Sequence, residues 1–209
     1  MRTSVLTLAL LLTSAFASAA EQTRPMPAFD AVSTQGAINM VVEVGQTQSL
    51  VLRGEEKIIS AIETKVVDGK LIITFPKNKK NSLNVSSETK ILIGMPALRA
   101  FHVEGAGSAE LKNVAGDSID IGFQGAGRLV ASGKVKYMKL TAQGVGDVDT
   151  KALLTQRADV SFEGIGAVKV HASDRLDAVV QGMGSLNYFG NPKVINKTVE
   201  GIGSVKAGG

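Results

Sequence analysis

The chain contains no cysteine and no tryptophan among its 209 residues, and only two tyrosines. Without cysteine it can form neither a disulfide nor a thiolate metal site, and it has no cysteine nucleophile. The shortage of aromatic rings predicts a narrow core filled by aliphatic side chains. The formal net charge of +4 is small, and no basic run is interleaved with aromatic residues. The sequence therefore carries no signature of nucleic-acid binding.

Long hydrophobic runs are also missing, apart from one near the start of the chain. Arg2, the apolar stretch Val5–Leu12 and the small residues Ala17-Ser18-Ala19-Ala20 have the order of a secretory leader. The apolar stretch is too short to span a bilayer. We expect cleavage after Ala19 or Ala20. The sequence therefore predicts an exported protein of the periplasm or cell surface, with no transmembrane segment.

Glycine, by contrast, is abundant, and its positions repeat. Six times in the second half an apolar residue is followed by Glu or Gln, then by Gly, an apolar residue and Gly. The first glycines of the copies are Gly105, Gly125, Gly144, Gly164, Gly182 and Gly201, and the second ones are Gly107, Gly127, Gly146, Gly166, Gly184 and Gly203. The first glycines are separated by 20, 19, 20, 18 and 19 residues, from the differences between these numbers. Such a period indicates one structural unit that is stacked repeatedly.

Each unit has the alternation of apolar and polar residues that is typical of a strand, as in Ile119, Ile121 and Phe123. The glycines would supply positive φ angles or allow close approach of neighbouring backbones. The apolar residue between them is interpreted as pointing inward at a tight corner. One unit is then a strand, a glycine corner, a second strand and a looser turn. We predict an all-β fold, a parallel β-solenoid of about 19–20-residue coils spaced about 4.8 Å apart.

The domain organisation follows from this repeat. We expect a signal peptide over residues 1–20, a less regular β region over 21–100, and the Gly-x-Gly solenoid over 101–209. The middle region is expected to cap the solenoid, because stacked repeats need protected ends.

Within the middle region, Ala37–Val44 and Gln48–Arg53 read as strands, and a hairpin is expected around Asp68-Gly69. Glu55–Ile62 is expected to form a short helix or a loop. The polar segment Pro76–Lys90 is expected to be a loop.

The repeats occur together with Phe29-Asp30, Gly36-Ala37-Ile38-Asn39 and Val66-Val67-Asp68-Gly69-Lys70-Leu71-Ile72-Ile73. In this combination the chain resembles the bacterial DUF2807 family, described as putative autotransporter adhesin, head GIN domain. The resemblance covers nearly all of the chain after the leader. It implies an exported, β-helix-like fold with an adhesion or envelope role. It implies no catalytic residues.

A polar residue precedes the first glycine of every repeat. In order these residues are Glu104, Gln124, Gln143, Glu163, Gln181 and Glu200. Stacked coils would place them in one row with a spacing of about 4.8 Å. No two glutamates are neighbours, and a glutamine amide can donate a hydrogen bond to a glutamate. We predict a structural ladder that also holds the register; a ligand-binding row is the alternative.

Few residues are candidates for chemistry. His102 and His171 are the only histidines, and they lie about three and a half coils apart, too far to share a metal. Asp147 and Asp149 share one outward strand face and could contribute to a Ca²⁺ site. The pair is single, however, and Lys169 is the only basic residue at the matching place one coil away. We therefore expect a solvated face, with no catalytic, cofactor-binding or metal-binding residues.

Two functions remain open. The first is a non-catalytic envelope module that presents flat β faces to another envelope protein, a glycan or a copy of itself. The second is a carbohydrate-active enzyme of the β-helix kind, either a polysaccharide lyase or a hydrolase. The lack of a clustered acid, base and cation site favours the first. Self-association through the C-terminal coil is possible because its strand edges have no evident cap, although Lys197 and Lys206 would blunt them.

Overall fold

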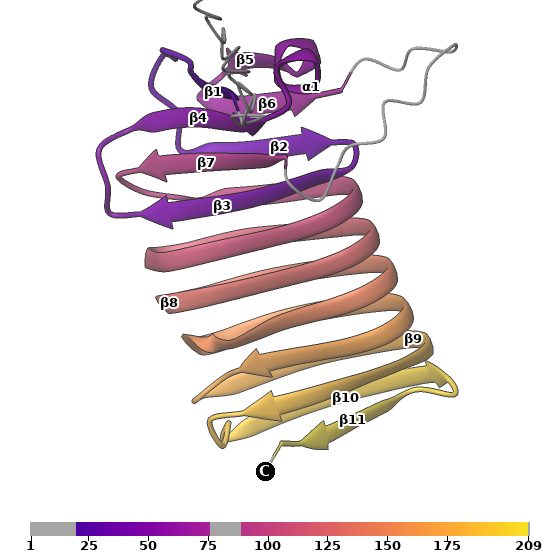
Figure 1. Ribbon diagram of the computed structural model, residues 1–209. Helices are drawn as coiled ribbons and strands as arrows, with labels where there is room; N and C mark the ends of the chain where they lie inside the picture. Colours follow the sequence, from indigo (N-terminus) through magenta and orange to yellow (C-terminus); the bar gives the residue numbers. More distant parts are fainter. Residues whose placement is uncertain (1–19, 76–88, 209) are drawn as a thin grey trace, which may run out of the picture.

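The computed structural model describes residues 20–75 and 89–208. The predicted leader, apart from Ala20, and nearly all of the predicted loop 76–90 lie outside these residues. The described chain is all-β except for one short helix, and its strands join in a single 11-stranded sheet. The sheet curls so that the chain passes back and forth between two faces (Figure 1).

The N-terminal region contributes seven strands and the helix. They are β1 (Ala20–Thr23), β2 (Ala31–Gln35), β3 (Ile38–Val44), β4 (Ser49–Gly54), α1 (Glu56–Ala61), β5 (Glu63–Val67), β6 (Lys70–Thr74) and β7 (Lys90–Met95). The two expected strands correspond to β3 and β4, and the expected hairpin is the antiparallel pair β5–β6. Asp68 and Gly69 make its turn with φ angles of 50° and 71°. Strands β1 and β2 were not expected from the sequence.

The repeats form the other four strands, which are β8 (Ala100–His171), β9 (Arg175–Phe189), β10 (Val194–Gly201) and β11 (Ser204–Ala207). Strand β8 stays extended over 72 residues while it winds through several turns of the stack. We call each passage from one Gly-x-Gly to the next a coil. Neighbouring coils pair in parallel, and β9 aligns with the end of β8 so that Arg175 lies beside Arg157.

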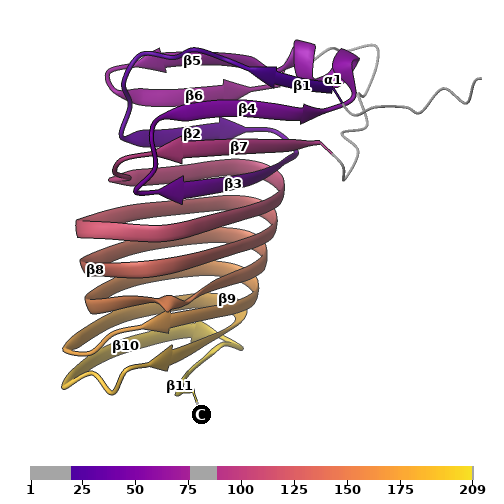
Figure 2. The ribbon, with the colours of Figure 1, turned by 60° about the vertical axis from the view of Figure 1, so that its left-hand side comes forward.

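The glycine corner divides each coil between two faces of the molecule. The first face consists of the segments before the Gly-x-Gly, and β2 and β6 extend it. The second face consists of the segments after it, and β3 and β7 extend it. These pairs are parallel, whereas β5, β4 and β1 at the N-terminal end pair antiparallel. Figure 2 shows these strands above the coils.

A single apolar core lies between the two faces. Its buried side chains extend without interruption from Phe29 to Val205. Ile119, Ile121 and Phe123 are buried, while the alternating residues between them face outward. Because the two faces lie close together, aliphatic side chains fill the space, and few rings are needed.

The glycine corners stack backbone on backbone. A Cβ atom on Gly125 would lie 1.9 Å from the carbonyl oxygen of Gly105, and one on Gly164 would lie 1.9 Å from that of Gly144. Real Cβ atoms do not approach this closely, so no other residue fits without a backbone shift. Gly164 also has a φ of +147°, which L-residues rarely adopt.

The residue between the two glycines points outward, so the expectation that it faces inward is wrong. The exposed fractions of the four larger ones are 55% for Val145, 47% for Ile165, 57% for Met183 and 85% for Ile202. The reason is steric. The corner is so tight that its interior holds only backbone, and the side chain must project from the convex side.

The last coil leaves its core-facing side chains uncovered within the described chain. Ile195 and Val199 are 38% and 41% exposed, although their partners in β9 are buried. Lys197 takes the place of the buried Ala178, and its Nζ reaches the carbonyl oxygen of Val205 at 3.5 Å. The amine thus crosses the open end of the core from β10 to β11. Its role in limiting self-association stays a prediction.

The close backbone approach at the corners makes a prediction about stability. Gly164 and Gly116 share a φ of +147°, but a Cβ atom on Gly116 meets no atom within 4 Å. Gly116→Ala should therefore cost about 1 kcal/mol of unfolding free energy from backbone strain alone. Gly164→Ala should cost about 2 kcal/mol or more, because a carbonyl must also move. Denaturant unfolding measures both changes in unfolding free energy. Equal losses in the two variants would show that the close contact between the backbones adds nothing to the cost of substituting Gly164.

Candidate functional site

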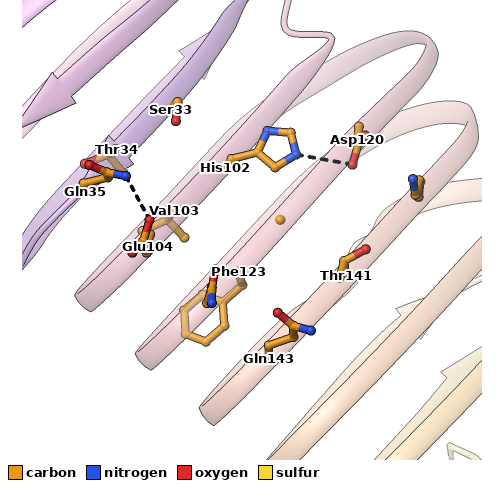
Figure 3. Close-up of a pocket in the computed structure, with 13 residues that line it drawn as sticks. Ser33, Thr34, Gln35, His102, Val103, Glu104, Asp120, Phe123, Thr141 and Gln143 are labelled. Carbon is orange, nitrogen blue, oxygen red and sulfur yellow. Dashed lines mark hydrogen bonds and ion pairs between the residues drawn. The ribbon is translucent and has the colours of Figure 1, made fainter.

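A polar groove of about 320 Å³ crosses the first face near its N-terminal end. It runs over β2 and the neighbouring passages of β8, as Figure 3 shows. Its polar lining residues include Ser33, Gln35, His102, Asp120, Lys139 and Thr141, together with the predicted ladder residues Glu104, Gln124 and Gln143. Its volume is at the lower end of the range for small-molecule sites.

The floor of the groove exists because one residue has no side chain. A Cβ atom on Gly122 would lie 2.3 Å from Cδ2 of His102. The imidazole therefore lies across the next coil, and its Nε2 comes within 3.6 Å of Oδ1 of Asp120. Both side chains are nearly half exposed, so the pair borders solvent.

Much of the hydrogen-bonding capacity of the groove is not used by the residues that the structure describes. Gln35 Nε2 donates to Glu104 Oε2 at 2.9 Å along one rim. The side chains of Ser33, Lys139 and Thr141 make no hydrogen bond or ion pair with any other residue that the structure describes. An ammonium and hydroxyl groups thus remain free to donate, and the hydroxyls can also accept.

Charged and polar side chains continue along the first face beyond the groove. Arg175 Nε and Asn196 Nδ2 donate to the carboxylate of Asp177 at 2.6 and 2.7 Å. These contacts, led by that of Arg175, lower the pKa of Asp177 to about 2. Tyr137 donates its hydroxyl to Asp159 Oδ2 at 2.6 Å, which raises the pKa of Tyr137 to about 12. These interactions fix the face beside the groove as a preformed polar surface.

The predicted ladder residues lie in one row along the edge of the first face. Register pairing places Gln181 beside Glu163 on one side and beside Glu200 on the other. Gln143 Nε2 donates to Glu163 Oε2 at 3.2 Å, and Gln181 Nε2 donates to Glu200 Oε2 at 2.8 Å. Gln181 therefore lies between two carboxylates. That these bonds hold the register stays a prediction.

The other candidate residues are dispersed. The backbone N–H of Thr155 donates to Nδ1 of His171, at the end of β8. Asp149 accepts a hydrogen bond from the Lys151 backbone and pairs with Lys169 Nζ at 3.4 Å. In residues 20–75 and 89–208, no three His, Cys, Asp or Glu side chains are grouped so that they could hold a metal ion. The same residues include no helix that is long and apolar enough to cross a membrane.

The groove was not found from the sequence. Its upper rim belongs to β2, which comes from a segment about seventy residues before the coil it joins. The sequence does contain one indication of the groove, because Gly122 interrupts the regular alternation of apolar and polar side chains. A glycine inside a strand often marks a place where another group approaches closely.

The hydrogen bond from Tyr137 to Asp159 makes a prediction about titration. In a Tyr188→Phe background, Tyr137 is the only tyrosine, so ultraviolet absorbance reports its phenol alone. We expect a midpoint at about 12. Asp159→Asn should shift it towards the ordinary value of about 10. Because the folded-state pKa is raised, the bond stabilises fully below about pH 10 and is lost between about pH 10 and 12. Identical midpoints would contradict the assignment.

Comparison with known proteins places the chain in a family. Among solved structures it is similar to a putative adhesin from Bacteroides fragilis, with a TM-score of 0.74, 22% identity, and coverage of 92% of this chain and 98% of that one. A putative adhesin from Parabacteroides distasonis has a TM-score of 0.56, 18% identity, and coverage of 91% and 97%.

A putative lipid binding protein from Parabacteroides distasonis also matches, with a TM-score of 0.51, 19% identity, and coverage of 92% and 98%. These likenesses concern the fold. A search of curated proteins gives no match. The model of one family matches residues 28–192. The chain therefore belongs to the DUF2807 family, "Putative auto-transporter adhesin, head GIN domain".

Proposed function

We propose that this protein is an exported, non-catalytic binding module of the cell envelope, which holds a glycan in the first-face groove. The observation that supports this most is the set of free donors and acceptors on the groove walls. A glycan offers hydroxyl groups that both donate and accept, and the Lys139 ammonium and the Thr141 hydroxyl can meet them. No tryptophan is present to stack on a sugar ring, and the ring of Phe123, which lines the groove, is buried, so recognition would rest on hydrogen bonds.

The architecture suits such a role. We interpret the curled sheet as a parallel β-solenoid of six coils, capped at its N-terminal end by the antiparallel strands β1, β4 and β5. A solenoid gives long, preformed faces, so a ligand binds without ordering the protein. The family description and the adhesin names of similar structures support a binding role. Export rests on the predicted leader.

A carbohydrate-active enzyme is the alternative, and the pairing of His102 with Asp120 is the feature that favours it. A histidine oriented by an acid can serve as a general base. Glycoside hydrolysis further requires two carboxyl groups that flank the scissile bond, one of them free to donate a proton. The two carboxylates of the groove are already engaged, because Glu104 accepts a hydrogen bond from Gln35 and Asp120 is paired with His102. The arrangement therefore supports binding better than turnover.

The test is binding of the protein, purified after export, to a panel of cell-wall and surface glycans, with product detection in the same wells. Lys139→Ala combined with Thr141→Val should weaken binding of the recognised glycan at least tenfold, about 1.4 kcal/mol. Gly122→Ala should weaken it as well, because the new methyl group displaces His102. Lys134→Ala, an exposed lysine outside the groove, is the matched control.

Three outcomes separate the possibilities. Loss of binding in the groove variants, with unchanged melting, supports the proposal. Binding that no groove variant changes would place the ligand elsewhere. Product formation that disappears in His102→Ala or Asp120→Asn would establish the enzyme instead.

A further inference from the structure

The outward residues of the Gly-x-Gly corners form a continuous apolar ridge. We call Val145, Ile165, Met183 and Ile202 the apolar ridge. Ala106 and Ala126 occupy the same position in the first two coils, so all six repeats carry an apolar residue there. The fold does not require this, because the side chain points into solvent. Six independent turns with the same apolar choice indicate that another surface covers the ridge.

The surroundings of the ridge limit what can cover it. The flanking glycines have no side chains, so each apolar side chain of the ridge is bordered only by backbone atoms. The next positions outward carry Asp147, Glu163 and Glu200, and the other side chains there are Ala, Ser or Gln. Lys and Arg are missing from these positions in the four ridge coils. The ridge is thus apolar with acidic flanks, which disfavours an anionic lipid surface and favours a basic partner.

A complementary surface lies on the second face of the same chain. Val51, Leu92 and Val41 are register partners on three neighbouring strands, β4, β7 and β3. Their side chains face outward and are half-buried. Grooves of about 530 and 280 Å³ meet at Val41, and the second extends to Val130 two coils further along. Glu110, the register partner of Val41 on β8, interrupts the apolar side chains before Val130. We call this row, from Val51 to Val130, the second-face trough.

One side of the trough is basic. Lys90 and Arg128 line this side, both are exposed, and neither makes an ion pair within the described residues. Glu110 also lies in the trough, but it is paired with Lys112 at 3.3 Å. Glu43 lines the opposite side, where it accepts a hydrogen bond from Gln46 at 3.4 Å and makes no ion pair within the described residues. The side formed by Lys90 and Arg128 is therefore the basic one, opposite in charge to Glu163 and Glu200.

We propose that the apolar ridge of one copy docks into the second-face trough of the next copy. Both features run along the stacking direction with one residue per strand, so their side chains share a spacing of about 4.8 Å. Glu163 and Glu200 then lie beside the basic rim formed by Lys90 and Arg128. This contact is independent of the first-face groove, which stays open.

The symmetry of the contact predicts its products. The ridge and the trough are different surfaces, so the interface is heterologous and leaves each pair with one free ridge and one free trough. Association therefore continues into rings or open chains. A standard interface buries about 800 Å² of accessible surface on each partner. A single row of side chains buries less, so the contact is weak and the extent of association depends on protein concentration.

Sedimentation velocity over a concentration series tests the docking of ridge into trough, with variants in which the charge of one of the two surfaces is reversed. Glu163→Lys with Glu200→Lys makes the ridge flanks basic, and Lys90→Glu with Arg128→Glu makes the trough rim acidic. Each double variant alone should stay monomeric where the wild type forms a series of oligomers. A mixture of the two should assemble again, because every ridge then meets a trough of opposite charge.

Met183→Ser with Ile202→Ser should abolish assembly, because the ridge loses its two most exposed apolar side chains. Val67→Ser, which changes an exposed apolar residue outside the ridge, should leave assembly unchanged.

A wild type that stays monomeric at every concentration would overturn the proposal, as would a mixture that fails to recover assembly. Cosedimentation of the monomer with phosphatidylethanolamine vesicles, lost in the Met183→Ser and Ile202→Ser variant, would also overturn it and assign the ridge to lipid.

Discussion

At every corner of the stack, the backbone of one coil lies directly on the backbone of the coil before it. The carbonyl oxygen of Gly144 occupies the space that a side chain on Gly164 would need, and the same contact recurs at Gly125. This spacing keeps the coils in one register. The parallel pairing of β8, β9 and β10 and the continuous core between the two faces both depend on that register.

The surface features follow from the same constraint. A corner without interior space turns its middle residue outward, which creates the apolar ridge. Fixed register also aligns outward residues of successive coils into rows, so charges and amides meet their neighbours as Gln181 meets Glu200. Where one row contains a glycine, at Gly122, the face is hollowed and His102 lies in the hollow. The fold therefore produces a polar groove and an apolar ridge on separate parts of the surface.

The repeat made the coils predictable, because the period of about twenty residues and the alternation around Ile121 are local properties of the sequence. The groove and the trough were not predictable in this way. Each combines strands that are distant in sequence, such as β2 beside β8 and β7 beside β3. Strand β2 reads Ala-Val-Ser-Thr-Gln, which is too short and too polar for its pattern to stand out. The direction of the ridge residues was missed because alternation does not extend through a corner.

Cysteine cross-linking tests the parallel register most directly, because the chain has no cysteine of its own. Ser161 and Val179 are register partners on neighbouring coils, and Thr198 is the partner of Val179 on the next coil. Ser161→Cys with Val179→Cys places two thiols on Cα atoms about 4.8 Å apart, within disulfide range. Ser161→Cys with Thr198→Cys places them about 9.6 Å apart, beyond that range. The stack predicts rapid intramolecular oxidation of the first pair and none of the second; the reverse result would contradict it.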